Sequence, residues 1–108
     1  METAIKSNGR LTDQWVASLA AEEQGDYRTA LDIHREILRQ ENASYASSLR
    51  AGWLYYVQGS FEEALRYYER ACALSSDEWP LYGIMNCLRA LGDQDALAVV
   101  SKALCTAP

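Results

Sequence analysis

The chain has 108 residues, of which 49% are hydrophobic and 23% charged, and this balance is that of one small globular domain rather than of a disordered chain. Its formal charge of −5 argues against a nucleic-acid partner, because a protein that follows phosphates needs a basic stripe. No apolar run approaches the ~20 residues that span a bilayer, and the first ten residues lack the apolar core of a signal peptide. We therefore expect a cytoplasmic protein with no membrane partner.

The three cysteines, Cys72, Cys87 and Cys105, are odd in number and widely spaced. A disulfide framework is expected to use an even number, and a zinc site needs closer pairs. We expect reduced and mostly buried thiols, with no bound metal and no cofactor.

Three segments repeat along the chain with a nearly constant period. Their glycines, Gly25, Gly59 and Gly92, are spaced by 34 and 33 residues, and an Ala-Leu pair follows each glycine within one turn or two. A period of this length is typical of stacked helical repeats.

Each repeat has the turn chemistry of a helix, a tight turn and a second helix. The glycine suits the left-handed end of the first helix. Asp26, Ser60 or Asp93 then stands where it can cap the second helix, and Glu63 would complete a capping box with Ser60. Pro80 fits the first turn of the fifth helix. The sequence predicts helices over residues 12–24, 27–40, 44–57, 61–75, 79–91 and 94–105.

The second repeat carries the fullest set of signature residues: Gly52, Tyr55, Gly59, Phe61, Ala64, Tyr68 and Ala71. From residue 11 onward the chain thus resembles the tetratricopeptide repeat (TPR) family. It departs from the pattern at His34 and Ile37 in the first repeat and at Gln94 in the third. The resemblance implies an all-α fold, a right-handed α-solenoid of three antiparallel helix-turn-helix hairpins with about six helices. Residues 11–108 would form one domain, with repeats at about 11–43, 44–77 and 78–106, and residues 1–10 a mobile tail.

The first helices of the hairpins carry a second apolar stripe that packing within a hairpin does not require. In the helix 44–57, Leu49, Trp53 and Tyr56 follow one another at i, i+4 and i+7. The resemblance implies that these first helices line a concave groove. Tryptophan, tyrosine and arginine are enriched among binding hot spots, although packing between repeats is the alternative. The predicted partner-binding residues are Trp15, Leu19, Leu49, Arg50, Trp53, Tyr56, Trp79, Tyr82, Asn86 and Arg89.

Such a groove predicts a non-catalytic protein–protein interaction module, an adaptor or small chaperone, that binds a client peptide or helix through hydrophobic anchors. The family's carboxylate clamp is not matched, because Trp15, Leu19, Arg50, Trp79 and Gly83 stand at its positions. Binding of an acidic chaperone tail in that mode is therefore not expected.

No arrangement of residues suggests catalysis, so we expect no enzyme activity. The one histidine, His34, is expected to be a packed or edge residue in the middle of a helix, without a nucleophile or second acid beside it. The pairs Glu22-Glu23 and Glu62-Glu63 are expected on solvated helix surfaces, with Glu62 paired to Arg66.

The alternative function is self-assembly into a homo-oligomer through the C-terminal helices. A repeat stack normally closes with a polar capping helix, and the sequence shows none after the sixth helix. We therefore expect either that the sequence is a piece of a longer protein or that a second copy or a partner covers this end. On this hypothesis Leu81, Ile84, Leu88, Val99 and Cys105 are partly uncovered, and Leu104 lies in the contact.

Overall fold

The computed structural model describes the backbone of residues 2–106 and the side chains of residues 11–103. Within this part the chain forms six α-helices and no strand. Their bounds are α1 Glu2–Glu23, α2 Tyr27–Gln40, α3 Tyr45–Val57, α4 Phe61–Leu74, α5 Trp79–Leu91 and α6 Gln94–Thr106. From α2 to α6 every boundary lies within one residue of the prediction.

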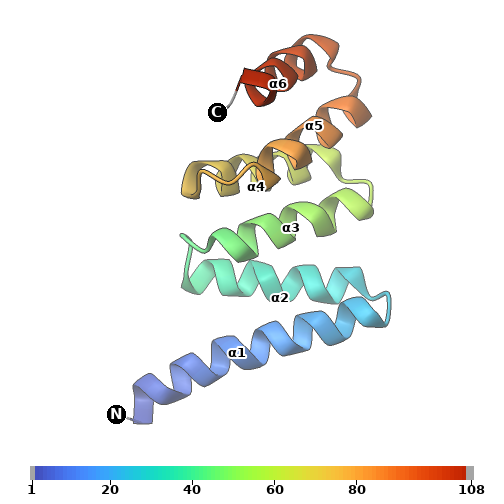
Figure 1. Ribbon diagram of the computed structural model, residues 1–108. Helices are drawn as coiled ribbons and strands as arrows, with labels where there is room; N and C mark the ends of the chain where they lie inside the picture. Colours follow the sequence, from blue (N-terminus) through green and yellow to red (C-terminus); the bar gives the residue numbers. More distant parts are fainter. Residues whose placement is uncertain (1, 107–108) are drawn as a thin grey trace.

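The helices stack in chain order into an α-solenoid, with α1 and α6 at its two ends (Figure 1). Each helix packs against its neighbours in the sequence, and α3 also touches α5. The Cα radius of gyration is 15.3 Å and the principal extents are 51 × 30 × 19 Å. A compact globule of this length would have a radius of gyration of about 13 Å. The elongated shape follows from stacking, because each hairpin meets only its neighbours.

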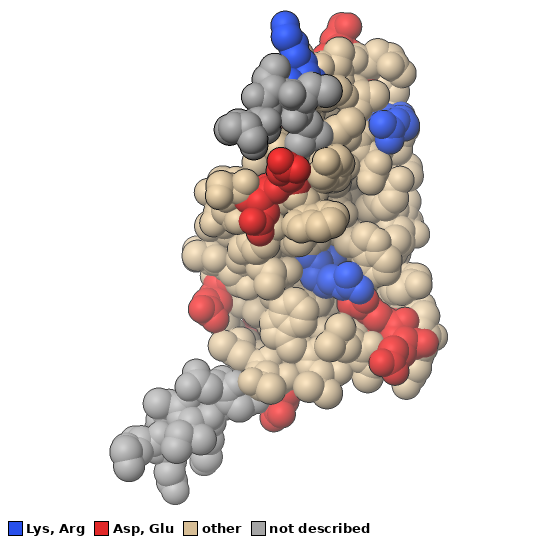
Figure 2. Space-filling view, viewed as in Figure 1, with Lys and Arg blue, Asp and Glu red and all other residues tan. Residues whose placement is uncertain are grey.

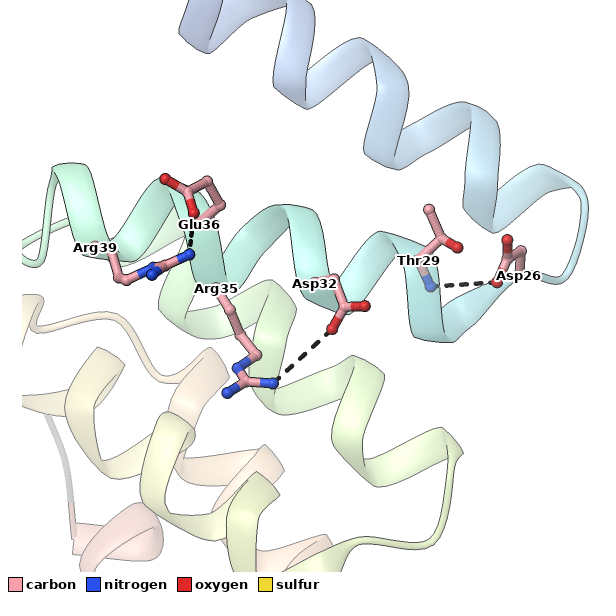
Figure 3. Close-up of polar contacts among 6 residues, drawn as sticks. All are labelled: Asp26, Thr29, Asp32, Arg35, Glu36 and Arg39. Atoms are coloured by element: carbon pink, nitrogen blue, oxygen red, sulfur yellow. Dashed lines mark hydrogen bonds and ion pairs between the residues drawn. The ribbon is translucent and has the colours of Figure 1, made fainter.

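The turns inside the three hairpins confirm the predicted role of glycine. Gly25, Gly59 and Gly92 have φ of 76°, 84° and 77°, the left-handed conformation that a side chain disfavours. Asp26 and Asp93 accept hydrogen bonds from the backbone N–H of Thr29 and Ala96 at 3.2 and 3.1 Å, as N-caps do. The first of these bonds is drawn in Figure 3.

The predicted capping box was wrong, because the Ser60 side chain makes no capping hydrogen bond. Ser44, a cap not predicted from the sequence, accepts a hydrogen bond from the Ser47 N–H at 3.2 Å at the start of α3. On the surface of α4, Arg66 pairs with Glu63 at 3.8 Å instead of with Glu62.

The first helix is longer than predicted, because α1 begins at Glu2 and not at residue 12. The side chains of residues 1–10 lie outside the described residues, so the mobile tail stays a prediction.

Two apolar clusters form the core along the stack. The first joins α1, α2 and α3 through Ala21, Ala30, Leu31, Leu38, Ala51 and Leu54. The second joins α4 and α5 through Ala64, Tyr68, Ile84, Cys87 and Leu88, and α6 packs on it with Ala96, Leu97 and Val100. Trp53 and Tyr55 of α3 contact both clusters, so α3 connects the two halves of the core.

The last hairpin exposes fewer apolar side chains than the self-assembly hypothesis expects. Ile84 and Leu88 are buried in the second cluster, because α4 and α6 enclose this face of α5, and the expectation that they are uncovered was wrong. Leu81 is half-buried and Val99 is 69% exposed. The side chains of Leu104 and Cys105 lie outside the described residues.

Burial should make Cys87 chemically inert in the folded protein. The side chain is fully enclosed, and this burial raises the pKa of the thiol to about 11. Since the thiolate is the reacting form, we expect alkylation of Cys87 at neutral pH to be at least about 100-fold slower in the native chain than in urea. A timed iodoacetamide pulse followed by peptide mass mapping measures both rates, and equal labelling in the two states would contradict the buried position.

Candidate functional site

An open pocket of about 470 Å³ lies between the first helices of the second and third hairpins. Its walls come from α3 and α5, and Tyr68 of α4 contributes to its base. The lining residues are Tyr45, Ala46, Leu49, Arg50, Trp53, Tyr68, Trp79, Tyr82, Gly83 and Asn86. Six of the ten predicted site residues are therefore brought together here.

The base of the pocket depends on two glycines that let the helices approach Tyr68. A Cβ atom on Gly83 would stand 2.4 Å from the Tyr68 ring, and one on Gly52 would stand 3.0 Å from it. Only 6% of Tyr68 is exposed. The ring therefore fills the space between α3 and α5 that two missing side chains leave open, and it supports the pocket from below.

Arg50 is held in place by two neighbours at the edge of the pocket. Its guanidinium donates hydrogen bonds to both carboxylate oxygens of Glu22 on α1, with the Nε to Oε2 distance at 2.9 Å. Its Cζ lies 4.3 Å from the centre of the Trp53 ring, a cation–π contact. The Glu22 side chain is only 9% exposed, so its predicted place on a solvated surface was wrong. This ion pair connects the first helices of the first two hairpins.

Trp53 and Trp79 have different surroundings, although both line the pocket. Trp53 is half-buried, contacts both core clusters and meets Tyr27 edge-on with ring centroids 5.7 Å apart. Trp79 is 69% exposed, and its ring neighbour is Tyr82 at 6.3 Å, itself 48% exposed. Trp53 thus has a structural role, whereas Trp79 and Tyr82 present free aromatic surface at the mouth of the pocket.

The other four predicted residues lie outside this pocket. Trp15 is half-buried and packs edge-on against His34, with centroids 4.5 Å apart. Tyr56 packs against Phe61 at 5.4 Å and belongs to the surroundings of the second cluster. Leu19 is 47% exposed on α1. Arg89 is exposed and donates a hydrogen bond of 3.1 Å to Asn86 Oδ1, which joins it to the pocket edge.

Four lining residues were not among the predicted site residues: Tyr45, Ala46, Tyr68 and Gly83. Tyr45 and Ala46 begin α3 one turn before Leu49, so helical periodicity could have included them. Tyr68 was predicted only as a signature residue of the repeat, and Gly83 only as a position where the carboxylate clamp is not matched. Their place under the pocket follows from the way α4 fits between α3 and α5.

His34 is packed inside the first hairpin, one of the two positions expected from the sequence. It is fully buried, and its Nδ1 lies 3.3 Å from Ser47 Oγ, while Nε2 has no hydrogen-bond partner among the described residues. Burial lowers the pKa of the imidazole to about 4, with smaller and opposing effects of Glu22 and Arg50. The ring is therefore neutral at physiological pH.

The side chains of residues 11–103 include no group of three histidine, cysteine or acidic residues placed to hold a metal ion. None of the helices among the described residues combines the length and apolar character that a membrane span requires. In the view of Figure 2 the described surface is mainly uncharged, and its basic groups form no continuous stripe.

This architecture defines a class of protein, the helical-repeat solenoids built from stacked antiparallel helix pairs. A family model described as tetratricopeptide repeat matches residues 21–85, more than half of the chain. The chain belongs to the tetratricopeptide repeat family. Repeats of this family generally mediate protein–protein interaction and are in general not catalytic. A search of curated proteins found no match.

Proposed function

We propose that the pocket between α3 and α5 binds an apolar segment of a client protein. The observation that carries this proposal is the exposure of Trp79 and Tyr82 beside an open pocket that already contains Leu49 and Trp53. Aromatic side chains exposed at a pocket are unfavourable in water, and a partner that covers them lowers the free energy of the system.

The chemistry of the lining residues selects the type of client. Aromatic and aliphatic surface predominates, so the client supplies one or two apolar anchors from an extended segment or an amphipathic helix. Asn86 is exposed beside this surface and offers polar contacts to the client backbone, and Arg89 stands next to it. Arg50 is already neutralised by Glu22, so it fixes Trp53 and does not capture a carboxylate. On this proposal the protein is a cytoplasmic, non-catalytic adaptor or small chaperone.

Trp79→Ala is the most selective test of this proposal. The side chain is mostly exposed, so its removal should change the free energy of unfolding by less than about 1 kcal/mol. If Trp79 is a hot spot, the affinity for a client peptide should fall at least about 30-fold, which corresponds to about 2 kcal/mol. The peptide is obtained by selecting a random peptide library on the wild-type chain, and both affinities are measured by calorimetry.

The matched control is Val99→Ala, which removes an equally exposed apolar side chain on α6, outside the pocket. It should leave the peptide affinity unchanged. A selection that enriches no apolar motif, or peptides that bind Trp79→Ala as tightly as wild type, would rule the pocket out as the client site.

The second candidate is self-assembly into a homo-oligomer. It is favoured by exposed apolar side chains at both ends of the stack, Val16 and Leu19 on α1 and Val99 on α6. Light scattering across a concentration range measures the mass of the particle. A mass of one chain at every concentration would refute self-assembly, and a larger mass that Val99→Glu reduces would support it.

A further inference from the structure

A second hollow, separate from the client pocket, lies on the surface of α2 and α4. It has a volume of about 490 Å³ and is lined by Asp32, Arg35, Glu36, Leu38, Arg39, Tyr67 and Arg70. A neighbouring hollow of about 320 Å³ shares Asp32 and Arg35 with it and extends to Arg28. Together they form one polar surface, which we call the arginine surface.

The spacing of the arginines sets the length of this surface. Arg28 and Arg39 are eleven residues apart along α2, with Arg35 between them. At ~1.5 Å per helical residue this is about 16 Å, the length of about five residues of extended peptide. Arg70 of α4 adds a guanidinium on the opposite wall of the larger hollow.

The guanidinium groups are weakly engaged by their neighbours. Arg35 stands 3.9 Å from Asp32, and both side chains are more than half exposed. Arg39 pairs with Glu36 on the same helix, and the four side chains are drawn in Figure 3. Exposed pairs within one helix contribute only ~0–1 kcal/mol, so an incoming anion can replace them at little cost. Arg70 donates one hydrogen bond of 3.3 Å to the Asn42 carbonyl and lies 5.6 Å from the Tyr67 ring.

The local charge opposes that of the whole chain. The seven residues of the larger hollow include three arginines and two acids, whereas the complete chain has a net charge of −5. Leu38 and Tyr67 add apolar surface between the charges. Planar guanidinium groups around such a hollow suit carboxylates, which they bind through paired hydrogen bonds.

We propose that the arginine surface binds a short acidic segment of a partner protein, about five extended residues rich in aspartate or glutamate. The segment's carboxylates contact Arg35, Arg39 and Arg70, and its chain follows α2 toward Arg28. The arginines of this surface belong to α2 and α4, the second helices of the first two hairpins, so a partner held by them leaves the pocket between α3 and α5 open.

Fluorescence anisotropy with labelled hexaglutamate tests the proposal on the full chain. Because the whole chain repels a polyanion, binding requires a local basic site. We expect binding at about 50 mM salt that weakens markedly at about 200 mM. Arg35→Gln combined with Arg70→Gln should weaken it at least about tenfold. Arg66→Gln, an exposed arginine of α4 that does not line the hollow, should leave it unchanged.

Three results would overturn the proposal. One is the absence of hexaglutamate binding at low salt, and another is an equal loss in Arg66→Gln. The third is displacement of hexaglutamate by inorganic phosphate at lower concentration than by glutarate, a dicarboxylate of similar charge, which would assign the surface to a phosphorylated ligand. Trp79→Ala should leave hexaglutamate binding intact, so failure here is distinguishable from failure of the client pocket.

Discussion

Replacing Gly83 with alanine is expected to lower the free energy of unfolding by about 2–3 kcal/mol. The new Cβ would stand 2.4 Å from the Tyr68 ring, which is buried and cannot move away without separating α4 from α5. In an unobstructed helix the same change stabilises the fold by about 0.5–1 kcal/mol. The sign of the measured change therefore shows whether the Tyr68 ring blocks the new Cβ. Urea unfolding followed by circular dichroism measures it.

Two further variants test whether a clash with the Tyr68 ring causes the loss of stability in Gly83→Ala. Gly52→Ala brings its Cβ to 3.0 Å from the same ring, so it should cost less than Gly83→Ala. In a double-mutant cycle, Tyr68→Leu should remove most of the penalty of Gly83→Ala, since the two sites share one space. Additive effects in that cycle would show that the ring is not the obstacle.

Lowering the pH from about 7 to about 5 is expected to destabilise the fold by about 2 kcal/mol through His34. Burial lowers the pKa of His34 from 6.5 to about 4 in the folded chain. In this window the unfolded chain therefore binds a proton that the folded chain does not. The stability that the neutral His34 contributes is fully present above pH ~7 and is lost as the pH falls toward 4. Below pH ~4 the ring is protonated in both states, so His34 causes no further loss of stability.

His34→Gln is the control for this pH dependence, because it removes the titrating ring and keeps a polar group near Ser47 Oγ. Urea unfolding at several pH values compares the two chains. The variant should be less stable than wild type near pH 7 and should lose less stability on acidification to pH ~5. Parallel slopes would mean that His34 is protonated as easily in the folded chain as in the unfolded one.

Local turn chemistry and the repeat period predicted the helices and the turns between them, and the resemblance to the TPR family supplied their stacking into a solenoid. Gly25, Gly59 and Gly92 adopt the left-handed conformation that their places between two helical patterns required. The start of α1 was missed because residues 1–10 are polar and have no periodic apolar face. At Ser60 the sequence has the residues of a capping box, but its side chain makes no capping hydrogen bond. A capping signature shows that the bond can form, and the side-chain rotamer decides whether it does.

The site was only partly predictable, since periodicity identifies a helix face but not what covers it. Trp15, Trp53 and Trp79 were all predicted to lie on the groove face of a first helix. Trp15 nevertheless packs on His34, Trp53 contacts both core clusters, and Trp79 remains exposed. The ion pair between Arg50 and Glu22 joins residues that are 28 apart in the chain, so local sequence patterns could not predict it.

The three tryptophans provide the most direct test of the client pocket. Each gives one indole N–H signal in a ¹⁵N-correlated NMR spectrum, and Trp53→Phe, Trp79→Phe and Trp15→Phe assign them. When a peptide selected on the wild-type chain is added, we predict that the Trp79 signal shifts most and the Trp53 signal shifts with it. The Trp15 signal should stay in place, because that ring packs on His34 outside the pocket. A shift of Trp15 with Trp79 unmoved would contradict a client site between α3 and α5.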